Sequence, residues 1–578
     1  MKLVIVESPA KAKTINKYLG KEYQVLASFG HIRDLPAQNG SVLPEKDFQM
    51  KWATDAKGEK HLKDIISALS KADEVYLASD PDREGEAIAW HIVEELKRRK
   101  KLSVPFKRVV FNEITKNAVM NGISNPREID MNLVNAYLAR RALDYLVGFT
   151  LSPVLWRKLP GSKSAGRVQS VALRLICERE KEIESFKKQE YWTIGTQLET
   201  LEKEEFKAML SVVNGKKLAK FDIPNEAEAQ NLKKQIEAEI FTVSEVEKKQ
   251  IKKAPAPAFT TSTMQQEASR KLGFSAKKTM QVAQKLYEAG HITYMRTDGV
   301  ALAQEAVMSM RDYIAQTFGD KYLPETPRFY KNKVKNAQEA HEAIRPTHIF
   351  NSPEKMASEL DRDGLRLYEL IFKRALACQM ANALLDKVAV DLTSGKGDLT
   401  LHATGQTIAF AGFIKLYKED TDDEKEEEST LLPPLEKGQR TNLLSVLPTQ
   451  HFTEPPPRYT EATLVKKMEE LGIGRPSTYA SILSVLQERA YAVLDKKRFI
   501  PEDRGQVVTA FLENFFSQYV QYDFTAKLEE ELDDVSAGGM IWTDLLKRFW
   551  THFDKTVQDV SPYRTAEVLD KVAILLLV

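Results

Sequence analysis

Residues 73–97 read DEVYLASDPDREGEAIAWHIVEELK, and this stretch decides the fold of the amino-terminal part of the chain. Asp73–Ser79 has the pattern of a buried strand, and Glu84–Lys97 has the apolar periodicity of a helix. Further strand-like runs lie before and after it, at Lys2–Glu7 and Lys107–Phe111. Because strands and helices alternate here, we expect a parallel α/β sheet.

The acidic turn inside this stretch has the residues of a metal site. Asp80 and Asp82 lie two residues apart directly after the strand, so their carboxylates can point to one place. Glu7 ends the first strand-like run, and functional groups gather where parallel strands end. Hard oxygen donors at this density favour Mg²⁺. An acidic helix start is the commoner explanation of a lone Asp-x-Asp, but the added Glu7 favours the metal.

A second candidate site is the segment His291–Asp298, which reads HITYMRTD. Its Tyr294 stands two residues before Arg296, whose guanidinium suits a phosphate group. A phenolic oxygen can attack phosphorus and keep the energy of the broken bond in a covalent ester. A structural tyrosine on a strand is the alternative, since Tyr-x-Arg alone is a common pattern.

Composition excludes several classes of protein. The chain has 578 residues, enough for roughly three to four domains, and its 43% hydrophobic and 29% charged residues exclude disorder and collagen-like repeats. No apolar run approaches the roughly 20 residues of a membrane helix, and the start has too few apolar residues for a secretory signal. Two cysteines, Cys177 and Cys378, exclude a disulfide framework and a CxxC zinc site. We expect a cytoplasmic protein.

The net charge is only +2, but positive charge is concentrated locally. Residues 157–177 and residues 268–287 each contain five Lys or Arg and no acid. Such stretches favour a phosphate-backbone ligand, although solvated helix faces explain either one about equally well. The basic loop 161–169 has P-loop glycine spacing, but Arg167-Val168 replaces the Lys-Ser/Thr that phosphates and Mg²⁺ need. We therefore expect no nucleotide cofactor.

Helical and strand-like regions alternate along the rest of the chain. Residues 132–184, 260–381 and those from 459 onward are helical in pattern, and 191–241 and 387–447 are strand-like. This order indicates one β domain interrupted by a helical insertion, and the outer helical pieces could form one discontinuous domain.

Two segments repeat a shape. Residues 259–279 and 459–478 each contain a Thr-rich helix start, a Leu-Gly turn and a second helix that opens with Ser/Thr and basic residues. This is the form of a helix-turn-helix, and a common αα-hairpin is the alternative.

Eight ordered motifs resemble those of the type IA DNA topoisomerases, in particular their bacterial topoisomerase I branch. They are VIVESPAKAKTI (4–15), GHIRDLP (30–36), SDPDREGEAIAWH (79–91), FNEITKNA (111–118), SAGRVQS (164–170), ITYMRTD (292–298), EAHEAIRPT (339–347) and GIGRPSTYA (472–480). The resemblance runs through nearly the whole chain.

The resemblance implies a mixed multidomain fold, in which a toprim α/β domain, helical domains and an arched β domain enclose a central hole. The implied domains are toprim at 1–128, a split helical DNA-binding domain at 129–185 and 450–578, an arched β domain at 186–255 and 382–449, and a helical domain with the nucleophile at 256–381.

The resemblance also implies an activity. One strand of negatively supercoiled DNA is cut through a 5′-phosphotyrosyl intermediate, another strand passes, and the cut is resealed with Mg²⁺ and without ATP. The implied partners are single-stranded and negatively supercoiled DNA, with no nucleotide cofactor and no membrane, and the protein would be a monomer.

Matching positions imply roles for individual residues. Tyr294 would be the nucleophile, Arg296 would stabilise the phosphate, and Glu7 would be a general acid near the leaving 3′ oxygen. Lys11 would add positive charge and His341 a supporting hydrogen bond. The implied Mg²⁺ ligands are Glu7, Asp80, Asp82 and Glu84. The implied single-stranded DNA path includes His31, Arg141, Tyr145 (stacked on a base), Arg157, Ser164, Ala165, Gly166, Arg167, Val168, Gln169, Arg296 and Arg475.

Two departures from the family pattern stand out. Many relatives have Ser after ITYMRTD, whereas this chain has Gly299, which puts one supporting hydrogen bond in doubt. The family's cysteine-rich zinc modules have no counterpart, and the apolar end 573–578 looks trimmed. Two other functions stay open from the residues alone: a Mg²⁺-dependent nuclease or primase that uses the same acids, and a non-catalytic single-strand binder.

Overall fold

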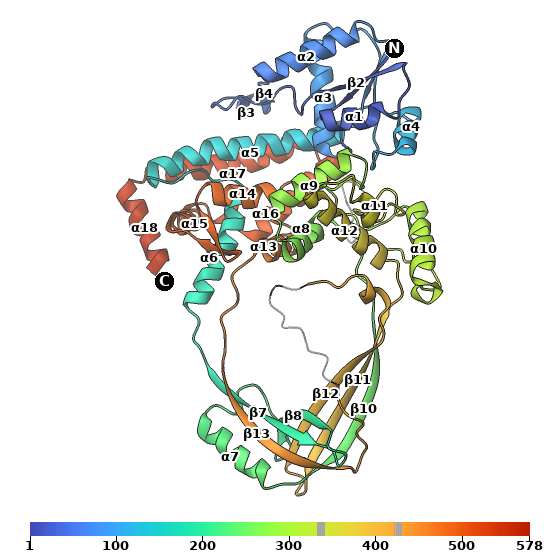
Figure 1. Cartoon of the computed structure of the whole chain (residues 1–578). Coiled ribbons are helices and arrows are strands. Elements are labelled where there is room, and N and C mark those ends of the chain that lie inside the picture. The colour runs from blue at the N-terminus through green and yellow to red at the C-terminus, as the bar shows by residue number, and fades with distance from the viewer. Residues whose placement is uncertain (332–341, 421, 423–430, 578) are drawn as a thin grey trace.

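The computed structural model describes residues 1–331, 342–420, 422 and 431–577. Figure 1 shows an α/β region at the top, a broad helical region below it, and an extended β region that hangs from the helices on two long legs. The ribbon therefore closes into a ring. The expected mixed multidomain fold with an arched β part is confirmed, whereas the exact division into four domains stays a prediction.

The α/β region is built on a parallel sheet with the strand order β2-β1-β5-β6. Its strands are β1 (Lys2–Val6), β2 (Tyr23–Ala27), β5 (Glu74–Leu77) and β6 (Phe106–Arg108), with α1 (Pro9–Asn16), α2 (Ala56–Leu69), α3 (Arg83–Arg98) and α4 (Lys116–Ser124) around them and a small β3 (Val42–Leu43)–β4 (Gln49–Met50) hairpin beside it. The central strands β1 and β5 pair directly, so their carboxyl ends lie next to each other. The strand expected at Lys107–Phe111 is shifted: the ladder ends at Arg108.

The two faces of this sheet belong to different cores. Leu3 and Ile5 of β1 pack into a core with α2 and α3. Val4 and Val6, which point to the other face as strand alternation requires, share a core with the helical region that contains Tyr294. The sheet therefore packs directly against the segment with the candidate nucleophile.

The outer helical pieces form one core despite their distance in sequence. The 28-residue helix α5 packs against α16 and α17 from the end of the chain. The members are α5 (Met131–Lys158), α6 (Gln169–Glu184), α13 (Glu461–Glu470), α14 (Tyr479–Glu488), α15 (Asp503–Phe515), α16 (Tyr522–Ser536), α17 (Trp542–Val560) and α18 (Thr565–Leu577). A hairpin of β14 (Ala492–Asp495) and β15 (Arg498–Pro501) interrupts the expected run of helices.

The inner helical region contains α8 (Thr261–Glu267), which continues into a short π-helical turn, α9 (Ala276–Glu288), α10 (Gln304–Phe318), α11 (Pro353–Met356) and α12 (Arg362–Ala377). The repeated shape seen in the sequence is present here. Thr260 and Thr460 both begin their helix with a capping box, and α8 packs on α13 as α9 packs on α14. The two copies are paired αα-hairpins.

The β region is a seven-stranded sheet with the order β12-β11-β10-β13-β7-β8-β9, and β12 also pairs with β8. Its strands are β7 (Glu190–Glu199), β8 (Glu205–Val213), β9 (Lys216–Lys217), β10 (Phe241–Lys253), β11 (Ala383–Ser394), β12 (Leu399–Phe410) and β13 (Arg440–Phe452). The helix α7 (Glu226–Glu237) lies within a stretch that the sequence pattern assigned to strands. Its Ala229, Leu232 and Ile236 are buried against the sheet, at helical spacing.

Candidate active site

The adjacent ends of β1 and β5 bring Glu7 and Asp80 together around one buried ammonium. Lys11, in the first turns of α1, is fully buried, and its Nζ lies 3.1 Å from Glu7 Oε1 and 2.9 Å from Asp80 Oδ1. Burial, followed by repulsion from Asp80, raises the pKa of Glu7 to about 8. Burial also disfavours the charged form of Asp80, but the Lys11 ammonium brings the pKa of Asp80 below its usual value. One carboxyl of the pair is thus protonated at neutral pH.

The turn between β5 and α3 is held from inside the protein. Arg108 is fully buried and donates to the backbone oxygens of Ser79 and Asp80, at 2.8 and 2.6 Å. Asp82 is the N-cap of α3 and accepts a hydrogen bond from the backbone N–H of Gly85. A Cβ at Gly85 would lie 2.0 Å from the Asp80 carbonyl oxygen, so only glycine fits there. The turn is therefore a rigid support for its carboxylates.

Tyr294 reaches this turn from the inner helical region. Its side chain is buried, and its Oη donates to Asp82 Oδ2 over 2.6 Å. Its backbone N–H donates to the carbonyl of Asn112 in the α/β region, and its ring packs edge-on against Tyr287 with centroids 5.1 Å apart. Burial and the Asp82 carboxylate hold the pKa of Tyr294 well above its ordinary value. The phenol is therefore protonated in this state.

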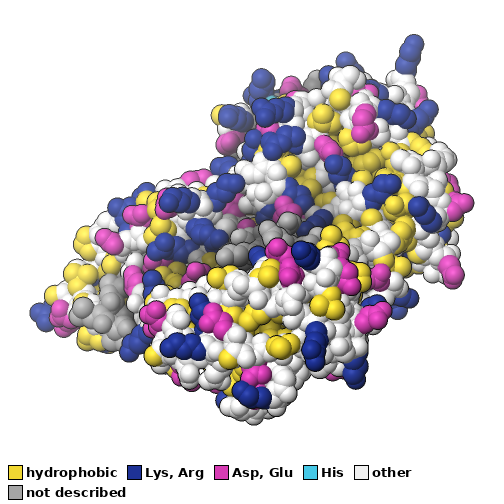
Figure 2. Space-filling view, turned by 60° about the horizontal axis from the view of Figure 1, so that its bottom comes forward, with side chains coloured by type: hydrophobic (Ala, Val, Ile, Leu, Met, Phe, Trp, Pro, Cys, Tyr) yellow, Lys and Arg dark blue, Asp and Glu magenta, His cyan; other side chains and the backbone are white. Residues whose placement is uncertain are grey.

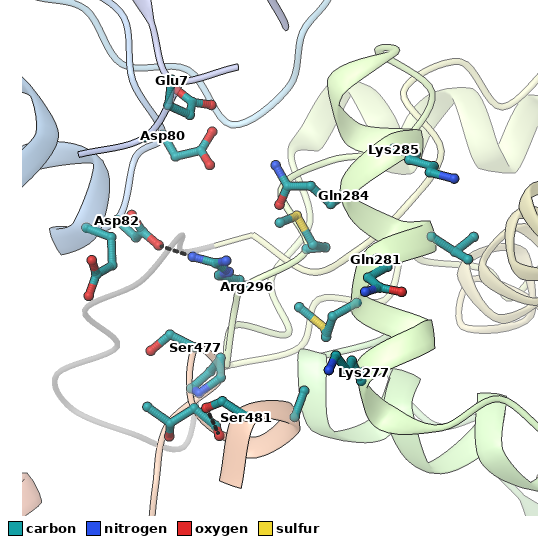
Figure 3. A pocket seen from close by; sticks show the side chains of 18 of the residues that line it. Glu7, Asp80, Asp82, Lys277, Gln281, Gln284, Lys285, Arg296, Ser477 and Ser481 are labelled. Carbon is teal, nitrogen blue, oxygen red and sulfur yellow. Dashed lines mark hydrogen bonds and ion pairs between the residues drawn. The ribbon is translucent and has the colours of Figure 1, made fainter. Parts of the chain in front are cut away.

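Arg296 lies beside the same carboxylate. Its Nη1 is 3.5 Å from Asp82 Oδ2, and its side chain is one-third exposed. Figure 3 shows it between Asp82 and the open space that adjoins the site. The guanidinium is thus close to the phenol and accessible to a phosphate group.

Glu84 and His31 form a pair at the edge of the site. His31 Nε2 lies 3.1 Å from Glu84 Oε2, and its ring stacks on Tyr137 with centroids 5.2 Å apart. Although burial opposes ionisation of Glu84, its hydrogen bond with His31 brings its pKa below the usual value. In this conformation Glu84 points to His31 and not to Lys11.

We call Glu7, Lys11, Asp80, Asp82, Tyr294 and Arg296 the acid cluster. Within the described residues no three His, Cys, Asp or Glu side chains converge as a complete metal site, because Lys11 stands between two of the acids. The donors nevertheless fit Mg²⁺, which takes one or two carboxylates together with water and substrate phosphates. With Glu7 protonated, Asp80 and Asp82 balance Lys11 and Arg296, and loss of the Glu7 proton would make room for a cation.

Two of the expected DNA contacts lie in a second, mostly buried group of charges. Arg167 is ion-paired with Glu529, and Arg475 donates to Asp533 Oδ2 through Nε and Nη2 at 3.0 and 2.6 Å. Arg140 Nη1 contacts Glu529 Oε2 at 2.7 Å. We call Arg83, Arg140, Arg167, Arg475, Glu529 and Asp533 the arginine cluster. It holds four guanidinium groups around two carboxylates of α16.

The other expected DNA residues lie apart from one another. Arg141 is paired with Asp34 through two contacts of 2.9 and 2.8 Å, and Arg157 is exposed on the last turn of α5. Tyr145 is buried, accepts a hydrogen bond from Ser41 N–H and packs on Phe149. Its side chain is only 4% exposed in this structure, and stacking of Tyr145 on a base stays a prediction.

The loop that precedes α6 is partly buried. Ser164 accepts hydrogen bonds at its carbonyl from Tyr491 Oη and Gln169 Nε2, and Ala165 is buried. Gly166 N–H faces the hydroxyl of Ser170, while Val168 is the residue before the helix. The loop is therefore fixed in position next to Arg167.

Sequence reasoning missed four members of the arginine cluster. Arg83 stands inside the motif SDPDREGEAIAWH, yet it reaches Ser477 and Asp533 of the helical region. Arg140 precedes the predicted Arg141, and Glu529 and Asp533 lie on α16, where no motif drew attention. Only the neighbouring motif residues could have pointed to Arg83 and Arg140.

His341 lies outside the described residues, and Gly299 donates its N–H to Thr297 Oγ1.

Comparisons with known proteins agree with this arrangement. A family model described as "DNA topoisomerase" matches residues 128–547, and one described as "Toprim domain" matches residues 2–114. DNA topoisomerase 1 of Rickettsia felis is 58% identical over 582 residues, which cover 99% of this chain and 75% of that protein. DNA topoisomerase 1 of Xylella fastidiosa is 51% identical, covering 96% of this chain and 70% of the relative.

A solved structure extends the likeness to three dimensions. Full-length topoisomerase I from Thermotoga maritima matches with a TM-score of 0.83 and 39% identity, over 96% of this chain and 90% of that one. The chain belongs to the DNA topoisomerase family, in its bacterial type IA branch. It relaxes DNA by transient cleavage and religation of a single strand.

Within the described residues, no helix has the length and apolar character needed to cross a bilayer.

Proposed function

We propose that Tyr294 is the nucleophile of this reaction and that it forms a 5′-phosphotyrosyl bond with the cleaved strand. The observation that carries the proposal is the 2.6 Å hydrogen bond from Tyr294 Oη to Asp82. A phenol whose pKa is held high needs a base before it attacks, and Asp82 is the acceptor in contact with its proton. Arg296, 3.5 Å from the same carboxylate, would stabilise the phosphate as charge develops.

Glu7 would complete the cleavage step on the other side of the phosphorus. As the Tyr294 oxygen bonds to phosphorus, the bond to the 3′ oxygen breaks, and that oxygen takes a proton. A carboxyl with a pKa of about 8 carries this proton at neutral pH. Lys11 lies 3.1 Å from Glu7 and would keep the carboxyl in place and add positive charge. Religation reverses these transfers.

Mg²⁺ is proposed as the cofactor, with Asp80, Asp82, Glu7 and Glu84 as its candidate ligands. When bound, it would neutralise phosphate oxygens near the break. Ionisation of Glu7 would leave three carboxylates against Lys11 and Arg296, so the form of the site that would hold Mg²⁺ has uncompensated negative charge, which supports the proposal.

The remaining expectations are proposals of the same kind. The substrate would be negatively supercoiled DNA with single-stranded character, contacted by the arginine cluster, Arg141, Arg157 and the loop before α6. The reaction would need no ATP, because the bond energy is kept in the tyrosyl ester. We also propose a cytoplasmic monomer.

The test is a cleavage assay with single-stranded oligonucleotides labelled at either end. The wild-type protein should remain attached to the 5′ end of the break after denaturation, and Tyr294→Phe should bind DNA but form no adduct. Tyr287→Phe is the matched control: this neighbouring phenol is buried, and its hydroxyl has no hydrogen-bond partner among the described residues. An adduct in Tyr294→Phe, or protein attached to the 3′ end, would contradict the proposal. Cleavage without any adduct would favour a nuclease.

A further inference from the structure

The segment 293–297, which contains Tyr294 and Arg296, belongs to no helix and to no strand of a sheet. No ladder of hydrogen bonds therefore fixes its backbone. Tyr294 Oη and Arg296 Nη1 nevertheless both contact Asp82 Oδ2, at 2.6 and 3.5 Å. Because a misplacement of about 1 Å can slow a reaction by about 10²-fold, a nucleophile on such a segment needs another support.

The hydroxyl of Thr261 holds the backbone that follows Tyr294. Thr261 is the first residue of α8 and is fully buried. Its Oγ1 donates to the carbonyl of Met295 at 2.7 Å, with the carbonyl of Thr297 at 3.1 Å as a second acceptor. The same oxygen accepts a hydrogen bond from the backbone N–H of Thr297 at 2.8 Å. The bonded groups lie on either side of Arg296, so one hydroxyl fixes the residue between them.

The hydroxyl of Thr293 holds the backbone that precedes Tyr294. Thr293 is buried, and its Oγ1 donates to the carbonyl of Ala343 at 2.8 Å. The same oxygen accepts a hydrogen bond from the backbone N–H of Arg345 at 2.9 Å. The backbone N–H of Thr293 in turn donates to the carbonyl of Arg345 at 2.9 Å. The nucleophile segment is thus fastened by a threonine hydroxyl on each side of the phenol, and we call Thr261 and Thr293 the threonine pair.

Helix capping and ligand contact do not explain these hydroxyl groups. Thr260 and Thr263 form the capping box of α8, so Thr261 is not needed to begin this helix. On the face shown in Figure 2, side chains of Lys, Arg, Asp and Glu are mixed at the surface, whereas both members of the threonine pair are buried. A buried hydroxyl costs free energy unless it is hydrogen-bonded, and each of these two both donates and accepts. Their bonds therefore act on the backbone next to Tyr294.

We propose that Thr261 and Thr293 are positioning residues of the cleavage step, whose hydroxyls keep the Tyr294 phenol and the Arg296 guanidinium directed at the scissile phosphate. The proposal rests on the proposed function, since it takes Tyr294 as the nucleophile. Both threonines act through the backbone and not on the reacting atoms. Thr261 lies outside all eight motifs, 33 residues before Tyr294, so the sequence pattern did not connect the two.

The test compares Thr261→Val and Thr293→Val, made separately, with Thr261→Ser and Thr293→Ser. Valine removes the hydroxyl, so the cleavage rate at saturating single-stranded oligonucleotide should fall about 10²-fold, with an unchanged Kd for the oligonucleotide. Serine keeps the hydroxyl and should retain most of the rate. The matched control is Thr279→Val, because Thr279 is also fully buried but its hydroxyl donates to Ser275 O at the start of its own helix, α9. This control should lower the melting temperature without slowing cleavage.

A second measurement, fluorine NMR of the protein with 3-fluorotyrosine at position 294, does not depend on the reaction. The wild-type protein and the serine variants should show one narrow resonance, and the valine variants should show a broadened or divided one. Wild-type cleavage rates in both valine variants, or an equal loss of rate in Thr279→Val, would overturn the proposal. If the wild-type protein forms no adduct while the resonance still broadens in the valine variants, the threonine pair holds Tyr294 and the proposed function fails.

Discussion

The acid cluster and the arginine cluster are both largely buried, yet acidic side chains outnumber basic ones in the first and basic side chains outnumber acidic ones in the second. Around Lys11, three carboxylates face one ammonium and one guanidinium, and the pKa of Glu7 rises to about 8. Around Glu529, burial also opposes ionisation, but Arg140, Arg167 and Arg475 together hold the pKa of this carboxyl far below its usual value. Burial acts alike in the two places, and the neighbouring charges decide its outcome.

This contrast indicates what each cluster lacks. The acid cluster gains excess negative charge, and is then suited to a cation, once Glu7 ionises. The four guanidinium groups of the arginine cluster face Glu529, Asp533 and Asp144, which leaves positive charge for an anion such as a phosphate. Arg83 joins the two clusters, because it follows Asp82 in the turn and contacts Asp533 in the helical region at 3.9 Å. Substitutions in the acid cluster should therefore affect metal-dependent activity, whereas substitutions in the arginine cluster should affect stability and DNA binding.

The largest effect is expected from the acid cluster. Asp80→Ala/Asp82→Ala should lower the rate of plasmid relaxation by at least about 10³-fold, because it removes two of the proposed metal ligands and the acceptor of the Tyr294 hydrogen bond. Relaxation of negatively supercoiled plasmid with Mg²⁺ and without ATP is the measurement. Glu45→Ala/Asp64→Ala, two exposed acids of the same α/β region, is the control. Full activity of Asp80→Ala/Asp82→Ala would contradict both the proposed metal site and the proposed role of Asp82 as acceptor of the Tyr294 proton.

In the arginine cluster the main effect should be on stability. Glu529→Gln leaves three guanidinium groups without their buried anion, which should cost about 3–5 kcal/mol at pH 7. Because the folded pKa of Glu529 lies below the unfolded value of about 4.3, its contribution is present above that pH and is lost as the pH falls. The difference in stability between the two proteins should thus be largest at pH 7 and should begin to shrink only as the pH falls below about 4. Glu530→Gln, exposed on the same helix, should change neither.

Glu7→Gln should raise the stability of the protein, whereas Glu529→Gln should lower it. The folded pKa of about 8 lies above the unfolded value, so Glu7 loses stabilising energy as the pH rises from about 4 to 8. A neutral amide avoids this loss and should stabilise the protein by about 1–3 kcal/mol at pH 8, while cleavage is lost. Melting curves without metal at pH 4 and pH 8 test this. A lower melting temperature of the variant at pH 8 would refute the raised pKa.

The smallest effect is expected for Arg475→Lys. Lysine keeps the charge but cannot make both contacts of the guanidinium with Asp533. The affinity for single-stranded DNA should fall about fivefold, with an unchanged salt slope because the number of cations is the same. Arg489→Lys, near the end of the same hairpin, serves as the control. A changed salt slope in Arg475→Lys would show that the number of phosphate contacts has changed, which would contradict this expectation.

Local sequence patterns predicted the part of the candidate site that lies at the ends of the strands. Glu7 and Asp80 were expected at one sheet edge because each directly follows a strand, and parallel strands end at the same edge. The Tyr294–Arg296 pair was expected near phosphate because their spacing places a phenol, the candidate nucleophile, close to a guanidinium. The repeat at 259–279 and 459–478 was visible as well, and the structure adds that its two copies pack on each other.

Tertiary structure alone decided the partners. Tyr294 and Asp82 are 212 residues apart, and Arg140 and Glu529 are 389 apart, so no local spacing connects them. The sequence also did not show that Tyr145 is buried and packs on Phe149. The helix α7 and the hairpin β14–β15 were missed because sheet contacts and short turns outweighed the average pattern of their regions.

The sequence by itself therefore determined which chemical groups this protein brings to DNA: carboxylates at strand ends, a tyrosine beside an arginine, and local positive charge. Only the folded chain decided which carboxyl is protonated and which arginines pair with the carboxylates of α16. The physical reason is that pKa values and ion pairs depend on burial and on charges within a few ångströms, and such neighbours are brought together by long-range packing.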